Sequence, residues 1–146
     1  MTDLNEQLLE AWLLLSTTII NNKVVSDMPY NESLICNILY KNQLHTPKNR
    51  LTATDLCNET KMLKSQMNRT LNSMEKKGLI SRERSSQDKR QVFVIFHPEN
   101  AGSYQKQHER ILQMADAIIA KLGSEKTLEV IELFENVSGM AREIID

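Results

Sequence analysis

The sequence predicts a mainly α-helical (α+β) fold in which long helical ends flank a short mixed segment. Two observations predict it. Between residues 4 and 77, and again from residue 103 onward, apolar residues recur every three or four positions, which is the period of an amphipathic helix. Between these stretches the period changes, and residues 79–84 and 91–97 indicate two strands joined by a polar turn.

The composition is that of an ordinary globular chain. Its 146 residues are 40% hydrophobic and 25% charged, which suits one domain with one main core. There is no apolar run long enough to span a bilayer and no signal-peptide pattern. The only cysteines are Cys36 and Cys57, which form no CxxC pair. We therefore expect a cytoplasmic protein with reduced thiols and no membrane partner.

The charge is unevenly distributed along the chain. Residues 61–90 hold nine basic and three acidic residues, a net charge of +6, whereas the rest holds nine basic and sixteen acidic residues, a net charge of −7. A basic middle in an acidic chain favours one surface for an anionic partner. A solvated charge run is the simpler alternative.

The first two helices are predicted from apolar stripes. The stripe of the first helix, which should end near residues 21–22, is Leu4, Leu8, Trp12, Leu15 and Ile19. Pro29 then interrupts the chain, and Asn31 is a suitable N-cap for a second helix with Glu32 in its first turn. The buried face of that helix is predicted to be Leu34, Ile35, Ile38 and Leu39.

Two further helices and a tight turn follow. Thr52 or Thr54 can cap a short third helix, which should end in a turn near residues 60–61. A fourth helix is expected from about residue 64 to 77, and Gly78 is placed to end it. The residues of this helix that should face the core are Met67, Leu71 and Met74.

The helical period returns after the two strands. A fifth helix should run from about Ser103 to Gly123, and Ser124 can cap a sixth. Residues 1–146 are expected to form a single domain. The expected winged helix-turn-helix part, residues 31–99, is too small to cover the apolar stripes of residues 1–30 and 100–146, so these helices are expected to pair two copies of the chain.

The order short helix, tight turn, helix and hairpin is the sequence form of a winged helix-turn-helix. The second helix of such a pair enters the major groove of DNA. Its candidate DNA contacts are Lys64, Ser65, Gln66, Asn68, Arg69 and Asn72. Amides can pair with adenine and Arg with guanine. An ordinary exposed polar face is the alternative reading of these residues.

The turn between the strands is rich in charge. The candidate DNA contacts of this wing are Arg82, Arg84, Asp88, Lys89 and Arg90. An Arg at such a tip can enter the minor groove, where the potential is most negative. Asp88 lies two residues from Arg90 and can fix the direction of its guanidinium. The alternative is a surface ion pair worth less than about 1 kcal/mol.

These segments resemble the MarR (multiple antibiotic resistance regulator) family of winged helix-turn-helix transcriptional regulators. The resemblance is carried by Gly78-Leu79-Ile80-Ser81-Arg82, by Asp88-Lys89-Arg90, and by the preceding helix from Lys64 to Lys77. It covers roughly residues 52–95. The sequence departs from the family pattern at Leu63, where a polar N-cap is usual, and at Phe96-His97, where Leu-Thr is usual.

The resemblance implies a homodimer that binds a pseudo-palindromic operator on double-stranded DNA and acts as a repressor. It implies base contacts from Ser65, Gln66, Asn68 and Arg69, and an Arg90 that reaches the minor groove with support from Asp88. It also implies a small aromatic or anionic effector that relieves repression. Candidate residues for the effector pocket are Trp12, Met28, Tyr30 and Tyr40.

Other function classes have less support. A metal-responsive regulator would use Cys36, Cys57, His45, His97, His108 or Glu109, but none of these has the spacing of a metal site. A redox switch is disfavoured because Cys57 is followed by Asn58 and Glu59, not by cations. No phosphate loop, HExxH or GxSxG is present, so we expect no enzyme and no cofactor. A winged helix that binds a protein instead of DNA is the remaining alternative.

Overall fold

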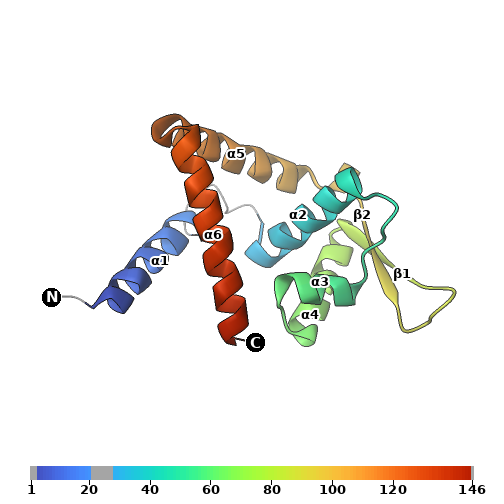
Figure 1. Cartoon of the computed structure of the whole chain (residues 1–146). Coiled ribbons are helices and arrows are strands. Elements are labelled where there is room, and N and C mark those ends of the chain that lie inside the picture. The colour runs from blue at the N-terminus through green and yellow to red at the C-terminus, as the bar shows by residue number, and fades with distance from the viewer. Residues whose placement is uncertain (1–2, 21–27, 146) are drawn as a thin grey trace. The chain divides into compact units, whose positions relative to one another are not determined.

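The computed structural model describes residues 3–20 and 28–145, and this part of the chain contains six α-helices and one two-stranded antiparallel sheet (Figure 1). In chain order the elements are α1 (Leu4–Ile20), α2 (Tyr30–His45), α3 (Ala53–Thr60), α4 (Lys64–Lys76), β1 (Ile80–Arg84), β2 (Val92–Phe96), the short 3-10 helix η2 (Pro98–Asn100), α5 (Gly102–Leu122) and α6 (Ser124–Ile145). This order confirms the predicted mainly helical fold with a winged helix-turn-helix.

The chain divides into two compact units, residues 1–107 and residues 108–146. The boundary falls within α5, so the first turns of this helix belong to the first unit. The helix-turn-helix and the hairpin lie wholly in the first unit. We call residues 28–107 the winged unit.

The start of the helix-turn-helix is fixed by a capping box. The Thr52 hydroxyl accepts from the Asp55 backbone N–H at 3.1 Å, and the Asp55 carboxylate accepts from the Thr52 N–H at 2.9 Å. Thr52, and not Thr54, is therefore the cap. At the other end Lys61 adopts a left-handed conformation, φ 61°, and its backbone N–H donates to the Cys57 carbonyl at 2.8 Å. This makes the predicted tight turn.

The end of α4 directs the chain into the hairpin. Gly78 has φ +77°, a conformation that glycine adopts without strain. Its N–H donates to the Glu75 carbonyl, and the Leu79 N–H donates to the Met74 carbonyl, both at 3.0 Å. These two bonds are a Schellman motif, which satisfies carbonyls at the helix end. Gly78 thus ends α4 as predicted.

The wing is a hairpin that is tied to the helix-turn-helix at its base. β1 and β2 pair from Ile80 opposite Phe96 to Arg84 opposite Val92. On the other side of β2 the Val94 N–H donates to the Leu51 carbonyl at 2.8 Å. The segment that leads into α3 therefore continues the sheet.

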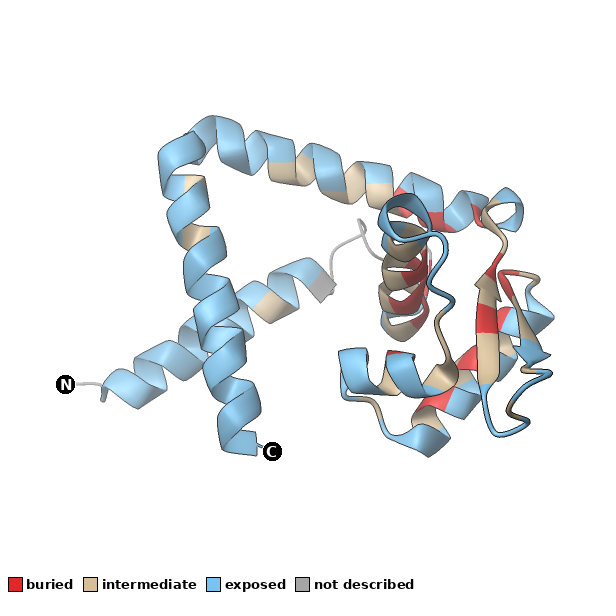
Figure 2. Ribbon diagram, turned by 45° about the vertical axis from the view of Figure 1, so that its right-hand side comes forward, coloured by how far each residue is buried: buried red, intermediate tan, exposed pale blue. Residues whose placement is uncertain are grey.

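Every buried hydrophobic residue of the described chain lies in the winged unit (Figure 2). Most come from α2, α3, α4, the sheet and the first turn of α5, and the others lie just before α2, β1 and α5. The fully buried side chains among them include Ile35, Leu56, Met67, Leu71 and Met74. Of the face predicted for α2, Ile35 and Leu39 are buried, while Leu34 and Ile38 are half-buried.

Two predicted helix caps are wrong. α2 begins at Tyr30 with Pro29 at the N-cap, so Asn31 lies inside the first turn. The fixed φ of proline suits the start of a helix, and this places the first helical residue directly after it. In the second unit Ser124 is already helical, and the first bond of α6 runs from the Thr127 N–H to the Gly123 carbonyl at 3.1 Å.

Candidate nucleic-acid interface

Helix α4 presents a polar face because three apolar side chains anchor the opposite face. Met67, Leu71 and Met74 are at most 1% exposed. Their spacing of four and three residues defines one side of the helix. Five of the six predicted contacts are exposed on the rest of α4, and Gln66 is half-buried: Lys64, Ser65, Gln66, Asn68, Arg69 and Asn72.

The outermost stripe of α4 runs the length of the helix. It consists of Ser65, Arg69, Asn72 and Lys76, spaced by four, three and four residues, and all four are exposed. Lys76 was not among the DNA contacts predicted from the sequence. Its spacing of four residues from Asn72 was the signal that would have added it to this face.

A hollow borders one flank of this stripe. It lies between the start of α2 and α4, within the winged unit, and has a volume of about 420 Å³. Its lining residues are Pro29, Tyr30, Asn31, Glu32, Gln66, Arg69, Thr70 and Ser73. Gln66 and Arg69 therefore stand at the edge of a concave surface.

The opposite flank of α4 is bound to the wing by Arg82. The Arg82 Nε donates to a Glu75 carboxylate oxygen at 3.2 Å, and its Nη2 donates to the Asn72 Oδ1. Only 27% of the Arg82 side chain is exposed. Both partners are on α4, so Arg82 joins β1 to this helix and has its charge largely balanced there.

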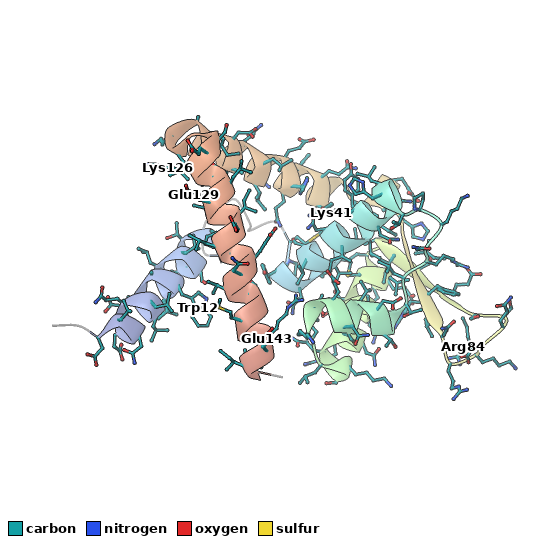
Figure 3. All side chains as sticks on the ribbon, in the orientation of Figure 1. Trp12, Lys41, Arg84, Lys126, Glu129 and Glu143 are labelled. Atoms are coloured by element: carbon teal, nitrogen blue, oxygen red, sulfur yellow. The ribbon has the colours of Figure 1, made fainter. Side chains whose placement is uncertain are left out.

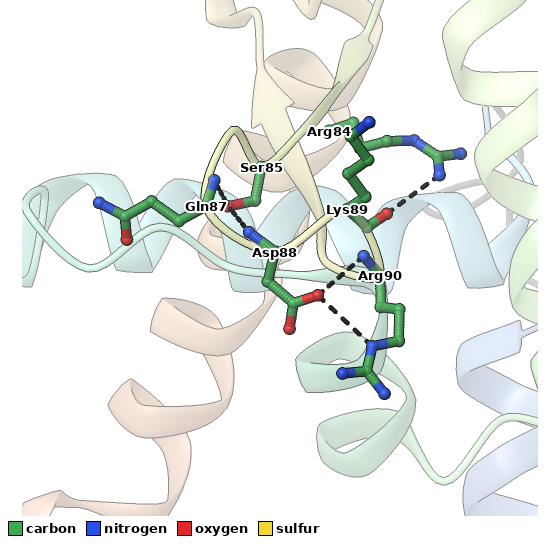
Figure 4. Close-up of polar contacts among 6 residues, drawn as sticks. All are labelled: Arg84, Ser85, Gln87, Asp88, Lys89 and Arg90. Atoms are coloured by element: carbon green, nitrogen blue, oxygen red, sulfur yellow. Dashed lines mark hydrogen bonds and ion pairs between the residues drawn. The ribbon is translucent and has the colours of Figure 1, made fainter.

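The wing tip holds its cations through short-range contacts (Figure 4). The Arg90 backbone N–H donates to Asp88 Oδ1 at 3.0 Å, and its Nε lies 3.5 Å from the same oxygen. The Arg90 side chain is 94% exposed. The structure thus brings Asp88 and Arg90 together as the spacing predicted, and leaves the guanidinium in solvent.

The other tip residues shape the turn. Arg84 projects from the hairpin end of β1 (Figure 3), and its Nη1 donates to the Lys89 carbonyl at 3.0 Å. The Ser85 hydroxyl accepts from the backbone N–H groups of Gln87 and Asp88, both at 3.2 Å. The Lys89 side chain is exposed. These bonds give the tip a defined conformation in place of a loose loop.

Arg50 contacts the wing near the turn end of its strands, and sequence analysis did not single it out. Its Nη2 donates to a Glu83 carboxylate oxygen at 2.7 Å, and its guanidinium carbon lies 4.3 Å from the centroid of the Phe93 ring. It therefore contacts both strands from the α2–α3 connection. Its partners are 33 and 43 residues away in the chain, so no local spacing indicated these contacts.

A second brace joins α4 to α2. The Lys77 Nζ donates to both carboxylate oxygens of Glu32 at 3.0 Å, and the Glu32 side chain is 4% exposed. A buried carboxylate requires such a partner, because desolvation of an unpaired charge is costly. Lys77 therefore fixes the end of α4 against the start of α2.

The candidate effector residues lie in different surroundings. Met28 is buried in the core of the winged unit. Tyr40 packs against that core, with its ring 6.4 Å from the ring of Tyr104. Tyr30 borders the hollow beside α4, and Trp12 on α1 is 65% exposed. Within the winged unit, Met28 and Tyr40 therefore have the environment of core residues.

The two free thiols, Cys36 and Cys57, differ in burial. Burial, with the nearby Glu32 carboxylate as a lesser cause, raises the pKa of the Cys36 thiol to about 12, so its thiolate is disfavoured. Cys57 is half-buried. Across residues 3–20 and 28–145, no three His, Cys, Asp or Glu side chains gather as metal ligands do. None of the helices described is long and apolar enough to cross a membrane.

Comparison with known proteins gives matches in sequence and in structure. Residues 26–91 match the model of the MarR family. The HTH-type transcriptional regulator FarR of Neisseria gonorrhoeae is 31% identical over 84 residues, which are 58% of this chain and 58% of FarR. The matched part is therefore less than two thirds of that relative.

Two solved structures match over nearly the whole chain. The PcaV transcriptional regulator from Streptomyces coelicolor, in complex with its natural ligand, has a TM-score of 0.75 at 17% identity, covering 97% of this chain and 98% of PcaV. NadR in complex with 4-hydroxyphenylacetate has a TM-score of 0.68 at 27% identity, covering 94% and 93% of the two chains.

Proposed function

We propose that this chain, whose residues 26–91 match the MarR family of transcriptional regulators, binds double-stranded DNA sequence-specifically and represses transcription as a homodimer. Helix α4 enters the major groove and the wing reaches the adjacent minor groove. The operator is pseudo-palindromic, with half-sites separated by about one helical turn, roughly 34–36 Å.

The single observation that carries this proposal is the exposed polar stripe of α4, set by three fully buried residues on the opposite face. Ser65, Arg69 and Asn72 are side chains that form hydrogen bonds with base edges. The braces from Arg50, Lys77 and Arg82 hold this helix and the wing in one orientation. A fixed geometry lowers the entropic cost of binding a rigid partner.

The homodimer is supported by the apolar surface of α1, α5 and α6. Leu128, Ile131 and Phe134 on α6 are 47–67% exposed, and no residue of α6 is buried. On α1, Leu8 and Trp12 are 66% and 65% exposed. Apolar surface of this extent is typical of a protein–protein interface. A second copy of the chain is the partner that provides a second α4, so that each half-site of the operator is contacted by one α4.

A small aromatic anion is the proposed effector. NadR, which this chain resembles at 27% identity, was solved with 4-hydroxyphenylacetate, a molecule of this class. Trp12, Met28, Tyr30 and Tyr40 remain the proposed effector residues. A rise in melting temperature with 4-hydroxyphenylacetate, together with release of bound DNA, would support this part of the proposal.

The salt dependence of DNA binding tests the proposed function. A protein that neutralises phosphates releases counterions, so log K should fall linearly with log salt, by about 0.9 for each phosphate contacted. A sequence obtained by selection from a random duplex pool should bind more tightly than random duplex at every salt concentration. A flat salt response, with no enriched sequence, would contradict DNA binding and would favour a protein-binding winged helix.

A further inference from the structure

The contact between Arg82 and Asn72 has a consequence for base recognition. We propose that Arg82 is a positioning residue that fixes the Asn72 amide as a hydrogen-bond donor toward DNA, so that Asn72 favours guanine over cytosine at the base it faces. This inference rests on the proposed function, because it assumes that α4 lies in the major groove.

The chemistry of arginine decides which Asn72 atom faces it. A guanidinium carries five N–H donors and no acceptor. The atom that contacts Arg82 Nη2 must therefore be the Asn72 carbonyl oxygen, as the structure has it. Arg82 is held in turn by Glu75, which lies three residues beyond Asn72 on the same helix. If the Asn72 amide rotated, its NH₂ group would face the guanidinium of Arg82. Both groups are donors, so no hydrogen bond would form between them.

The fixed amide leaves its NH₂ group for a partner outside the protein. Asn72 is exposed on the outermost stripe of α4, whereas Arg82 is largely covered. An unrestrained Asn can present either its oxygen or its nitrogen and so can pair bidentately with adenine. With the oxygen engaged in a charge-assisted bond, the side chain acts chiefly as a donor.

A fixed donor discriminates between bases in the major groove. Guanine presents two acceptors there, N7 and O6, whereas cytosine presents the N4 amino donor. A donor facing cytosine gains no bond and leaves polar groups unpaired, which is costly in a contact surface that excludes water. Thymine O4 and adenine N7 are acceptors, so these bases should give intermediate affinity.

The test uses a duplex selected with the wild-type protein, in which each half-site position is changed to all four bases. The position that faces Asn72 is the one whose preference disappears in Asn72→Ala. At that position the wild type should bind guanine about tenfold more tightly than cytosine. Asn72→Asp keeps the shape and the bond to Arg82 but has no donor. Because a carboxylate accepts from cytosine N4, this variant should reverse the preference.

Arg82→Ala and Glu75→Gln form the matched pair. Arg82→Ala frees the amide, so the guanine-to-cytosine ratio should fall to about twofold or less, whatever happens to overall affinity. Glu75→Gln removes the charge of the other partner of Arg82 and should keep the ratio. Circular dichroism checks that each variant is folded. If Arg82→Ala is not folded, the wild-type preference between guanine and adenine tests the positioning role, because an unrestrained Asn pairs bidentately with adenine.

The outcomes separate this inference from the proposed function. Sequence-specific binding by the wild type, with Asn72→Asp weakening all four bases equally, would overturn the inference and leave the function standing. An unchanged ratio in a folded Arg82→Ala variant would overturn the positioning role. Failure of the wild type to enrich any duplex sequence would overturn the proposed function, and this inference with it.

Discussion

The winged unit buries many of its apolar side chains, whereas residues 108–145 leave theirs exposed or half-buried. Leu71, in α4, is fully buried, and the core around it draws on α2, α3, the sheet and the start of α5. From residue 108 to 145 no residue is buried, although α6 carries Leu128 and Phe134 at 67% and 54% exposure. The first region completes its own core, whereas the second presents an apolar surface.

The two regions therefore obtain their stability from different contacts. Burial of apolar surface is the main favourable term in folding, and the winged unit obtains it within one chain. A helix pair with exposed apolar side chains gains little from its own contacts, and obtains such burial on association. The two regions should therefore respond differently to substitution and to protein concentration.

The largest expected effect comes from a matched pair of leucines. Leu71→Ala should lower the free energy of unfolding by about 2–5 kcal/mol at every protein concentration, because it leaves a cavity in a complete core. Leu128→Ala should instead weaken assembly and leave the winged unit intact. Denaturant unfolding at several protein concentrations distinguishes the two. An equal, concentration-independent loss for both would remove the contrast between the regions.

The wing should affect DNA binding without affecting fold or assembly. Arg90→Ala removes an exposed cation and should cost about 1.5–3 kcal/mol in operator binding, the range for a hydrogen bond to a charged group. Arg90→Lys should recover only part, since an ammonium lacks the planar fork. Asp88→Ala should be intermediate because the cation remains but loses its anchor.

A diffuse basic patch would give another order for these three variants. Removal of the Asp88 carboxylate would then tighten binding, and Arg90→Lys would equal the wild type. Titrations at one fixed salt concentration distinguish the two accounts. Unfolding curves should be the same for all three variants and the wild type, because the tip contributes no side chain to the core.

Substitutions on the polar face of α4 should reduce the sequence specificity of DNA binding. Arg69→Ala or Gln66→Ala should cost about 1–3 kcal/mol on the selected operator and less on random duplex. Arg69 is exposed on the outer stripe, and Gln66 borders the neighbouring hollow. Competition between operator and random duplex measures the difference. Equal losses on both would mean that these side chains contact phosphates only.

The smallest effect concerns alkaline pH and should be confined to the winged unit. Burial raises the pKa of Cys36 and of Tyr104 to about 12, from ordinary values of 9.0 and 10.0. Below about pH 9 both groups are protonated in the folded and unfolded states, so stability is at its full value. As pH rises toward about 12 the unfolded state loses these protons first, and stability falls.

Cys36→Ala gives the control for this pH dependence. The variant should lose some stability at all pH values through its cavity, yet show a smaller further loss between about pH 8 and about pH 11. Denaturant unfolding at these two pH values measures that difference. A pH dependence identical to that of the wild type would show that the Cys36 thiol titrates normally.

Local patterns predicted those parts of the fold that local forces determine. The buried stripe of α4, the turn near Lys61 and the end at Gly78 follow from helical period and backbone preference. The Asn31 cap failed because Pro29 is the N-cap, so the helix begins two residues earlier than predicted. The choice between Thr52 and Thr54 needed the reciprocal bond with Asp55, which only the structure shows.

The braces of the candidate site could not be predicted in the same way. Lys77 and Glu32 are 45 residues apart, and their pairing depends on how α2 packs against α4. Arg82 was expected to contact DNA from the wing, and the structure turns its guanidinium onto Asn72 and Glu75. The partners of long polar side chains depend on how the helices and strands pack, so sequence spacing carries little information about these contacts.

The molar mass of the complex formed on the selected operator shows how many chains bind one duplex. Light scattering should give two chains of 16.8 kDa for each duplex, with the winged units on the DNA and the apolar helices holding the copies together. The same protein should bind a duplex with both half-sites scrambled much more weakly. A mass that corresponds to one chain for each duplex, or equal binding to the scrambled duplex, would contradict the account.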